Sequence, residues 1–254
     1  MTQNTPWHGK VAVVTGGSSG IGQATAHALA EQGARVLITG RNAERLSQTA
    51  QNIKGIETLL ADSADPASSA QIVQTALDHW GRIDLIVNNA GAGHPMPMTD
   101  YTPEAIAAIS NVNITAPSLL VHSARPALRD SRGAIVNIST ALTQGSVPML
   151  AHYAATKAAL EHLTRSWAIE LAGDGIRVNA IAPGPVKSGA LTGMMGLTPE
   201  MAQQVEVQEA AQIPLGRRGE PGDIVSWVLQ LGSIENRWLT GQILTIDGGW
   251  SQRG

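Results

Sequence analysis

Short runs of β-branched and aliphatic residues alternate along the chain with longer amphipathic stretches. The runs are apolar on both faces, which is typical of strands buried in a parallel sheet. Seven runs predict strands: Val11–Thr15, Val36–Thr39, Glu57–Ala61, Ile83–Asn88, Ala134–Ser139, Arg177–Ile181 and Ile243–Ile246. The stretches between them predict helices over 21–32, 43–52, 66–80, 103–128, 152–172 and 220–231. This alternation indicates an α/β fold with a doubly wound parallel sheet and helices on both faces.

No repeat, low-complexity tract or linker divides the 254 residues, so we expect residues 1–254 to form a single domain. The stretch 183–214 interrupts the alternation with prolines, glycines and methionines, and it contains a short predicted helix at 199–209. Long segments of this kind often close over a ligand. We therefore predict a substrate lid at about 188–213, with an unstructured loop as the alternative.

Composition excludes several classes of function. The net charge is −3 without a basic block, which argues against nucleic acid and anionic membranes as partners. There is no cysteine, and the seven histidines lack metal-ligand spacing, so we expect neither thiolate catalysis nor a metal site. No apolar run approaches the ~20 residues of a membrane span, and the first ten residues lack an apolar signal core. We expect a soluble cytoplasmic protein.

The segment Thr15–Gly22 follows the first predicted strand and opens the first predicted helix. Its glycines let the backbone turn tightly and approach a pyrophosphate, whose charge is favoured at a helix N-terminus. No lysine follows the last glycine, which disfavours a nucleotide-triphosphate loop. The candidate cofactor contacts in this turn are Gly16, Ser18, Ser19, Gly20, Ile21 and Gly22.

The second predicted strand ends without the acidic residue that binds the adenosine ribose of NAD(H). Gly40 and Arg41 stand there instead, and a nearby arginine accommodates a 2′-phosphate. The sequence therefore favours NADP(H), with NAD(H) as the alternative if Arg41 merely opens a polar helix. Asp62, at the end of the third strand, is placed to contact the adenine.

Tyr153 and Lys157 are four residues apart, so they project from the same face of a helix. An ammonium near a phenol favours phenolate and makes tyrosine a usable general acid or base. The alternative is an ordinary surface pair on an amphipathic helix.

Asn88-Asn89-Ala90-Gly91 closes the fourth predicted strand and completes an ordered set of motifs. The set is Thr-Gly-x3-Gly-Ile-Gly, Asn-Asn-Ala-Gly, a downstream asparagine, a hydroxyl residue, Tyr-x3-Lys and Pro-Gly. Over essentially the whole chain it resembles the shorter, single-domain branch of the short-chain dehydrogenase/reductase family. The resemblance implies a Rossmann fold, a nicotinamide dinucleotide, and hydride transfer to or from a carbonyl carbon.

The resemblance also implies roles for individual residues. Tyr153 would exchange a proton with the substrate oxygen, and Lys157 would lower its pKa and hold the nicotinamide ribose. Asn113 would hold a water that feeds protons toward the lysine. Further cofactor contacts would come from Asn89, Ala90, Gly91, Pro183, Gly184, Val186 and Ser188. Relatives of this kind are commonly homo-oligomers, so we expect a tetramer or a dimer.

One position departs from the family pattern. The serine that polarises the carbonyl normally lies thirteen residues before the tyrosine, and Thr140 stands there with Ser139 beside it. Adjacent strand residues point to opposite faces, so the two hydroxyls are not expected to act together. Thr140 is the favoured candidate, and Ser139 is the alternative if the strand end bulges.

The leading interpretation is an NADPH-dependent carbonyl reductase that also works as a secondary-alcohol dehydrogenase, with 3-oxoacyl thioesters among the candidate substrates. The alternatives are an NAD(H)-dependent alcohol dehydrogenase and a catalytically silent dinucleotide-binding sensor. An epimerase or dehydratase is disfavoured, because those relatives resemble longer chains. We expect substrate specificity to lie in 92–100, 141–152 and 188–213, where His94 and His152 are candidate contacts.

Overall fold

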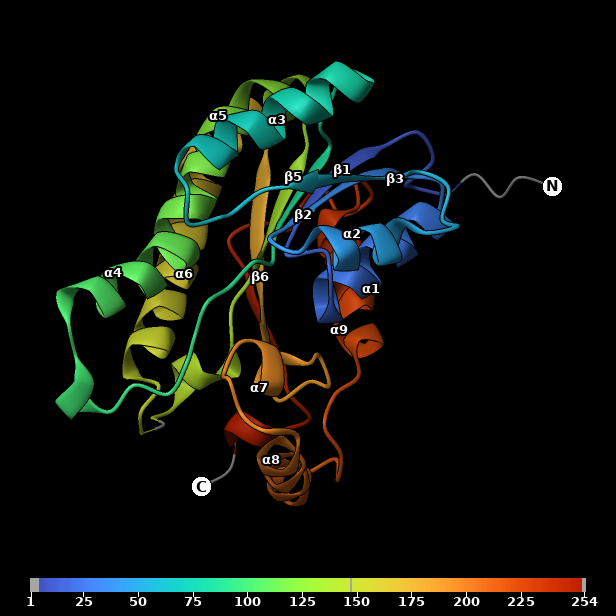
Figure 1. Cartoon of the computed structure of the whole chain (residues 1–254). Coiled ribbons are helices and arrows are strands. Elements are labelled where there is room, and N and C mark those ends of the chain that lie inside the picture. The colour runs from blue at the N-terminus through green and yellow to red at the C-terminus, as the bar shows by residue number, and fades with distance from the viewer. Residues whose placement is uncertain (1–4, 147, 253–254) are drawn as a thin grey trace.

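Seven parallel strands form one sheet in the computed structural model, which describes residues 5–146 and 148–252 (Figure 1). The strands are β1 (Val11–Thr15), β2 (Arg35–Gly40), β3 (Ile56–Leu60), β4 (Leu85–Asn88), β5 (Ala134–Ile138), β6 (Arg177–Pro183) and β7 (Ile243–Ile246). Their spatial order is β3-β2-β1-β4-β5-β6-β7. The order reverses between β1 and β4, and ligands of open α/β sheets bind at the carboxyl ends of the strands beside such a switch point.

Helices cover both faces of the sheet, with α1, α2 and α9 on one face and α3, α5 and α6 on the other (Figure 1). The helices of the first face are α1 (Gly20–Glu31), α2 (Ala43–Ala50) and α9 (Pro221–Gly232). Those of the second are α3 (Ala67–Trp80), α5 (Ala116–Ser131) and α6 (Ala151–Glu170). The helix α4 (Pro103–Ser110) lies beside α6, away from the sheet (Figure 1). Two more, α7 (Ala190–Gly193) and α8 (Pro199–Gln212), lie together beyond the sheet. The predicted doubly wound fold is confirmed.

Alternating side chains of each strand enter two separate apolar cores. Val14 of β1 packs with α1 and α9, whereas its neighbour Val13 packs with α3 and α5. Both are fully buried. Because successive side chains point to opposite faces, a strand covered on both sides must be apolar throughout. This is why the strands appear in the sequence as continuous aliphatic runs.

The predicted helix 103–128 is interrupted in the structure. A π-helical turn at Asn111–Thr115 separates α4 from α5, and the predicted short helix at 199–209 extends to Gln212 as α8. Single π turns are often found at functional sites, because the widened turn changes the direction of a side chain. Asn113, in the middle of this turn, is one of the candidate site residues.

The helical path Pro103–Ser131 is long and apolar enough to cross a bilayer. Length and composition alone are weak grounds for a membrane span, because core helices of globular proteins meet the same test. Here Leu120, Ala124 and Leu128 of this path are buried in the core that α5 shares with α3.

Candidate active site

The glycine turn between β1 and α1 is shaped by close contacts that only glycine allows. Gly16 and Gly20 have φ of +65° and +55°, a region that L side chains rarely adopt. A Cβ on Gly22 would lie 2.4 Å from the Asn89 side-chain nitrogen, and one on Gly20 would lie 2.8 Å from the Cβ of Ser188. The turn therefore touches both the segment after β4 and the segment after β6.

Hydrogen bonds fasten the glycine turn to the segment after β4. The Thr15 hydroxyl accepts from the backbone N–H groups of Asn89 and Ala90, at 3.1 and 3.0 Å. The Asn89 amide donates to the carbonyl of Thr15 at 2.9 Å. At the start of α1, Ser19 makes no side-chain capping bond to the helix, so the first N–H groups remain directed at the space above the turn. A glycine cradle with an uncapped helix N-terminus fits a pyrophosphate.

The ends of β2 and β3 lie on the same side of the site as the glycine turn. A Cβ on Gly40 would meet the Ser18 hydroxyl at 3.2 Å, so the end of β2 touches the turn directly. Arg41 follows with an exposed side chain. Asp62 is exposed as well, and its carboxylate accepts from the N–H of Ala64 at 2.9 Å. This contact gives Asp62 a local structural role besides the predicted contact with adenine.

Lys157 of α6 is a buried cation, with 3% of the residue exposed. Its Nζ donates to the carbonyl of Ile138, at the end of β5, over 2.8 Å. Burial lowers the pKa of Lys157 to about 8, because removing an ammonium from water disfavours its charged form. The lysine therefore titrates close to physiological pH.

Tyr153 lies one turn before Lys157, and its ring packs on the backbone of Gly93. A Cβ on Gly93 would approach the ring to 2.5 Å, so glycine is required there. Burial raises the pKa of Tyr153, and a hydrogen bond with the Thr140 side chain lowers it by a smaller amount. The Nζ of Lys157 is directed at the carbonyl of Ile138. The role predicted for Lys157, lowering the pKa of Tyr153 for proton exchange, stays a prediction.

The two candidate hydroxyls after β5 have different partners. The Ser139 hydroxyl donates to Oε1 of Glu161 at 2.6 Å. The backbone N–H of Ser139 donates to the carbonyl of Ile181 at 2.7 Å and so extends the pairing of β5 with β6. The ladder continues without a bulge, and Thr140 is extended, with φ −158° and ψ 146°. Thr140 therefore points to the other face, where it meets Tyr153.

Glu161 was not found from the sequence. Its Oε1 accepts from the hydroxyls of both Ser139 and Thr143, at 2.6 and 2.8 Å. These residues stand on either side of Thr140, so the carboxylate of α6 holds the turn that carries it. The sequence offered one indication of its role: Glu161 follows Lys157 by four residues and therefore lies on the same face of the helix.

Asn113 uses both ends of its side-chain amide. The oxygen accepts from the N–H of Ala92 at 2.9 Å, while the nitrogen donates to the Ala92 carbonyl at 2.8 Å and to the Thr156 hydroxyl at 2.9 Å. The π turn thus ties the loop after β4 to α6. A cavity of about 20 Å³ beside it, with Asn88 in its lining, has room for one water. The predicted water-holding role stays a prediction.

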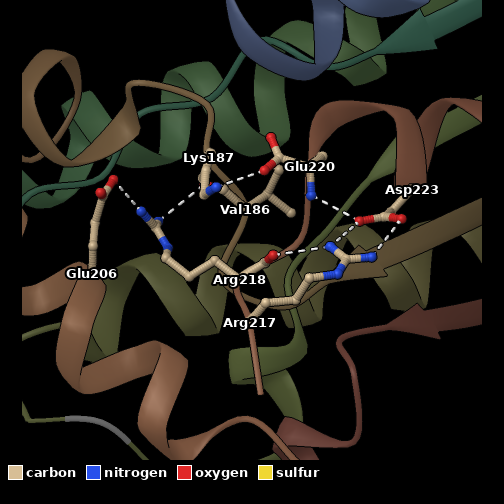
Figure 2. Close-up of polar contacts among 7 residues, drawn as sticks. All are labelled: Val186, Lys187, Glu206, Arg217, Arg218, Glu220 and Asp223. Carbon is tan, nitrogen blue, oxygen red and sulfur yellow. Dashed lines mark hydrogen bonds and ion pairs between the residues drawn. The ribbon is translucent and has the colours of Figure 1, made fainter. Parts of the chain in front are cut away.

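The remaining candidates follow β6 in one segment. Gly184 lies against Asp247, where a Cβ would come within 2.6 Å of the aspartate Cβ. The carbonyl of Val186 accepts from Arg218 at 3.0 Å (Figure 2), and Ser188 meets Gly20 as described above. The structure therefore brings the candidates from the four segments after β1, β4, β5 and β6 to one edge of the sheet. In the described part of the chain, no group of three or more His, Asp or Glu side chains is arranged to hold a metal ion.

The glycine turn at the switch point of a seven-stranded parallel sheet defines a Rossmann-type protein of the dinucleotide-binding class. Residues 16–251 match the family model described as "Enoyl-(Acyl carrier protein) reductase". The 3-oxoacyl-[acyl-carrier-protein] reductase FabG of Thermotoga maritima is 35% identical over 246 residues, which cover 95% of this chain and 97% of that protein.

Solved structures show the same relationship. A short-chain dehydrogenase/reductase of unknown function from Caenorhabditis elegans, crystallised with cofactor, superposes with a TM-score of 0.92 at 34% identity, covering 98% of this chain and 97% of that one. The 3-ketoacyl-(acyl-carrier-protein) reductase of Brucella melitensis, complexed with NADH, gives a TM-score of 0.88 at 31% identity, covering 96% and 99%. The chain belongs to the short-chain dehydrogenase/reductase family. It is an oxidoreductase of that family, whose members bind NAD(P)(H).

Proposed function

We propose that this protein is an NADP(H)-dependent carbonyl reductase that works in reverse as a secondary-alcohol dehydrogenase. The observation that carries the proposal is the hydrogen bond between the side chains of Tyr153 and Thr140, one helical turn from the buried Lys157. A protonated phenol and a second hydroxyl at one point suit a carbonyl oxygen that gains charge as it is reduced.

Each residue has a separate task in the proposed reaction. Tyr153 donates its phenolic proton to the carbonyl oxygen, and the raised pKa of this phenol keeps the proton in place at neutral pH. Thr140 donates a hydrogen bond to the same oxygen. Lys157 holds the nicotinamide ribose, and Gly16 to Gly22 hold the pyrophosphate. The bound dinucleotide supplies the hydride in reduction and accepts it in oxidation.

Arg41 is the basis for preferring NADP(H). Its exposed side chain stands at the end of β2, next to the point where Gly40 meets Ser18. The alternative, NAD(H), is supported by the NADH bound to the similar Brucella reductase. Wild-type protein is assayed first, by nicotinamide absorbance with NADPH and separately with NADH, against a panel of ketones and 3-oxo esters. Turnover with NADPH and poor turnover with NADH is the expected result.

Arg41→Ala is expected to raise the KM for NADPH by roughly 10- to 100-fold, because a hydrogen-bonded charge pair with the phosphate is lost. The KM for NADH should stay unchanged, since NADH lacks that phosphate. Arg45→Ala, in the first turn of α2, is the matched control. An equal change with both cofactors, or a wild-type preference for NADH, would contradict the proposal.

Thr140→Val is expected to lower kcat by about 10²-fold or more, because it removes one donor to the developing oxyanion at nearly constant volume. Thr140→Ser keeps the hydroxyl and should retain most of the activity. Ser139→Ala should affect KM and kcat less than Thr140→Val does, because its hydroxyl is bonded to Glu161. The roles of the two residues would be exchanged if Ser139→Ala were the more damaging change.

We further propose that the substrate enters past the loop after β4 and the start of α6. Tyr101 and His152 pack edge to face there, with ring centroids 4.5 Å apart. His94, in the loop after β4, is exposed. Val147, within the predicted specificity segment 141–152, lies outside the described residues. The name of the Thermotoga relative supports 3-oxoacyl thioesters as the first substrates to try. Residues 188–213 would form the lid of this site.

Two exposed apolar side chains support the proposal of a homotetramer or dimer. Trp238 is fully exposed, at 101%, and Ile169 of α6 is 80% exposed. Large apolar side chains of this kind are often covered by a partner subunit. Light scattering of the purified protein measures the subunit number directly. We also propose a cytoplasmic protein without nucleic-acid or membrane partners.

A further inference from the structure

Helix α8 is held against the rest of the protein by few apolar contacts. Ala202 is its one buried residue, whereas α9 buries five. Met201 and Val207 of α8 are 50% and 66% exposed. An element with so little buried apolar surface belongs to the less stable part of a fold unless another interaction holds it.

Arg218 supplies that interaction. Its side chain is 6% exposed, and it meets two carboxylates of α8. Nη1 donates to Glu206, and Nε forms an ion pair with Glu209 at 3.0 Å. Burial raises the pKa of Glu209, and the charge of Arg218 acts against that effect. The guanidinium therefore offsets part of the effect of burial on this carboxylate of α8.

The same guanidinium reaches the segment after β6. Nη2 of Arg218 donates to the Val186 carbonyl at 3.0 Å (Figure 2). The neighbouring Gly219 pairs with this segment through its backbone, donating to Pro185 and accepting from Lys187, both at 2.9 Å. One buried side chain thus joins α8 to the segment after β6, in which the family resemblance implies cofactor contacts at Val186 and Ser188.

Arg217, the adjacent arginine, makes different contacts. It donates to both carboxylate oxygens of Asp223 on α9, at 2.7 and 3.1 Å, and to the carbonyl of Arg218 at 3.0 Å (Figure 2). Its side chain is 55% exposed. The chain therefore contains a matched control, an arginine in the same loop whose partners are not on α8.

We propose that Arg218 is a positioning residue that couples the lid helix α8 to the Pro185–Ser188 segment, so that dinucleotide binding and closure of the lid are linked. The link to catalysis rests on the proposed function; the mechanical coupling does not. A planar guanidinium presents its donors in a fixed fork, and here it donates to Glu206 and to the Val186 carbonyl while forming an ion pair with Glu209. A single ammonium on a flexible stem does not reproduce this geometry.

Hydrogen exchange of the Arg218→Lys variant tests the coupling. Without dinucleotide, exchange in 199–212 and in 185–188 should both become faster, by roughly 5- to 50-fold. With NADPH, wild type and Arg217→Lys should gain protection in 199–212, whereas Arg218→Lys should lose most of that gain. The KM values for NADPH and for carbonyl substrate should rise more than kcat falls. Faster exchange in α8 alone, or no change in either segment, would overturn the proposal.

A second variant covers the case in which Arg218→Lys does not fold. Glu206→Gln with Glu209→Gln leaves Arg218 in place and removes the two α8 carboxylate charges that it meets, and it should also increase exchange at 185–188. General destabilisation would instead raise exchange in β4 and β5 as well. Failure of the proposed function would show as wild-type protein without turnover or without NADPH-induced protection at 16–22. In that case, hydrogen exchange in 199–212 and 185–188, compared between wild type and the variants without dinucleotide, still tests whether Arg218 couples the two segments.

Discussion

Tyr153→Phe is expected to lower kcat for carbonyl reduction by a factor of about 10³ or more while NADPH still binds. The phenylalanine ring keeps the packing on Gly93 but has no proton to donate, and it removes the hydrogen bond between Tyr153 and the Thr140 side chain. Steady-state nicotinamide absorbance measures the loss, and tryptophan fluorescence with added NADPH measures the binding.

The chain provides a matched control for this change, because Tyr101 is its one other tyrosine. Tyr101→Phe keeps the ring that packs on His152 and should leave kcat close to the wild-type value. If Tyr153→Phe retained a large part of the wild-type kcat, Tyr153 would not be the proton donor. Wild-type protein that binds NADPH but turns over no substrate would instead support the sensor alternative.

Lys157→Met is expected to lower kcat by about 10²-fold or more and, at neutral pH, to make the protein more stable. With a pKa of about 8 in the fold and an ordinary value of 10.5, the charged lysine costs about 3 kcal/mol at pH 7. Methionine removes this cost but leaves the Ile138 carbonyl without its donor, which costs about 1–2 kcal/mol. The net gain expected in the free energy of unfolding is about 1–2 kcal/mol.

The same residue makes stability depend on pH. Between pH 8 and 10.5 the unfolded chain binds this proton more tightly than the fold does, so wild-type stability rises with pH in that window. From pH 7.5 to 9.5 the rise should be about 2 kcal/mol. The raised pKa of Tyr153 acts in the opposite direction only as pH passes its ordinary value of 10.0.

Urea unfolding of the two proteins without dinucleotide, at pH 7.5 and 9.5, tests this expectation. The stability difference between wild type and Lys157→Met should shrink at the higher pH. Lys54→Met, at an exposed lysine between α2 and β3, is the control and should follow the wild type at both values. A Lys157→Met protein that lost stability equally at both pH values would show that packing, and not buried charge, governs this position.

Arg218 and Glu161 show why part of the site had to come from the structure. Each is a charged residue in a helix or loop, where a solvated surface position is the ordinary expectation. Arg218 is buried because α8 and the segment after β6 converge on it from distant parts of the chain. Glu161 shares a helix face with Lys157, yet its partners Ser139 and Thr143 come from the preceding strand–helix connection.

The sequence by itself determined the strands, most of the helices, the glycine turn and the placement of Tyr153 and Lys157 one turn apart on a helix. These depend on interactions between residues near one another in the chain: periodic burial, backbone freedom at glycine, and one turn of helix. Only the tertiary structure decided the order of the strands, the partner of each hydroxyl at Ser139 and Thr140, and the direction in which the pKa of Tyr153 is shifted. Those depend on which groups from distant segments exclude water from a side chain or donate a hydrogen bond to it, and local sequence does not contain that information.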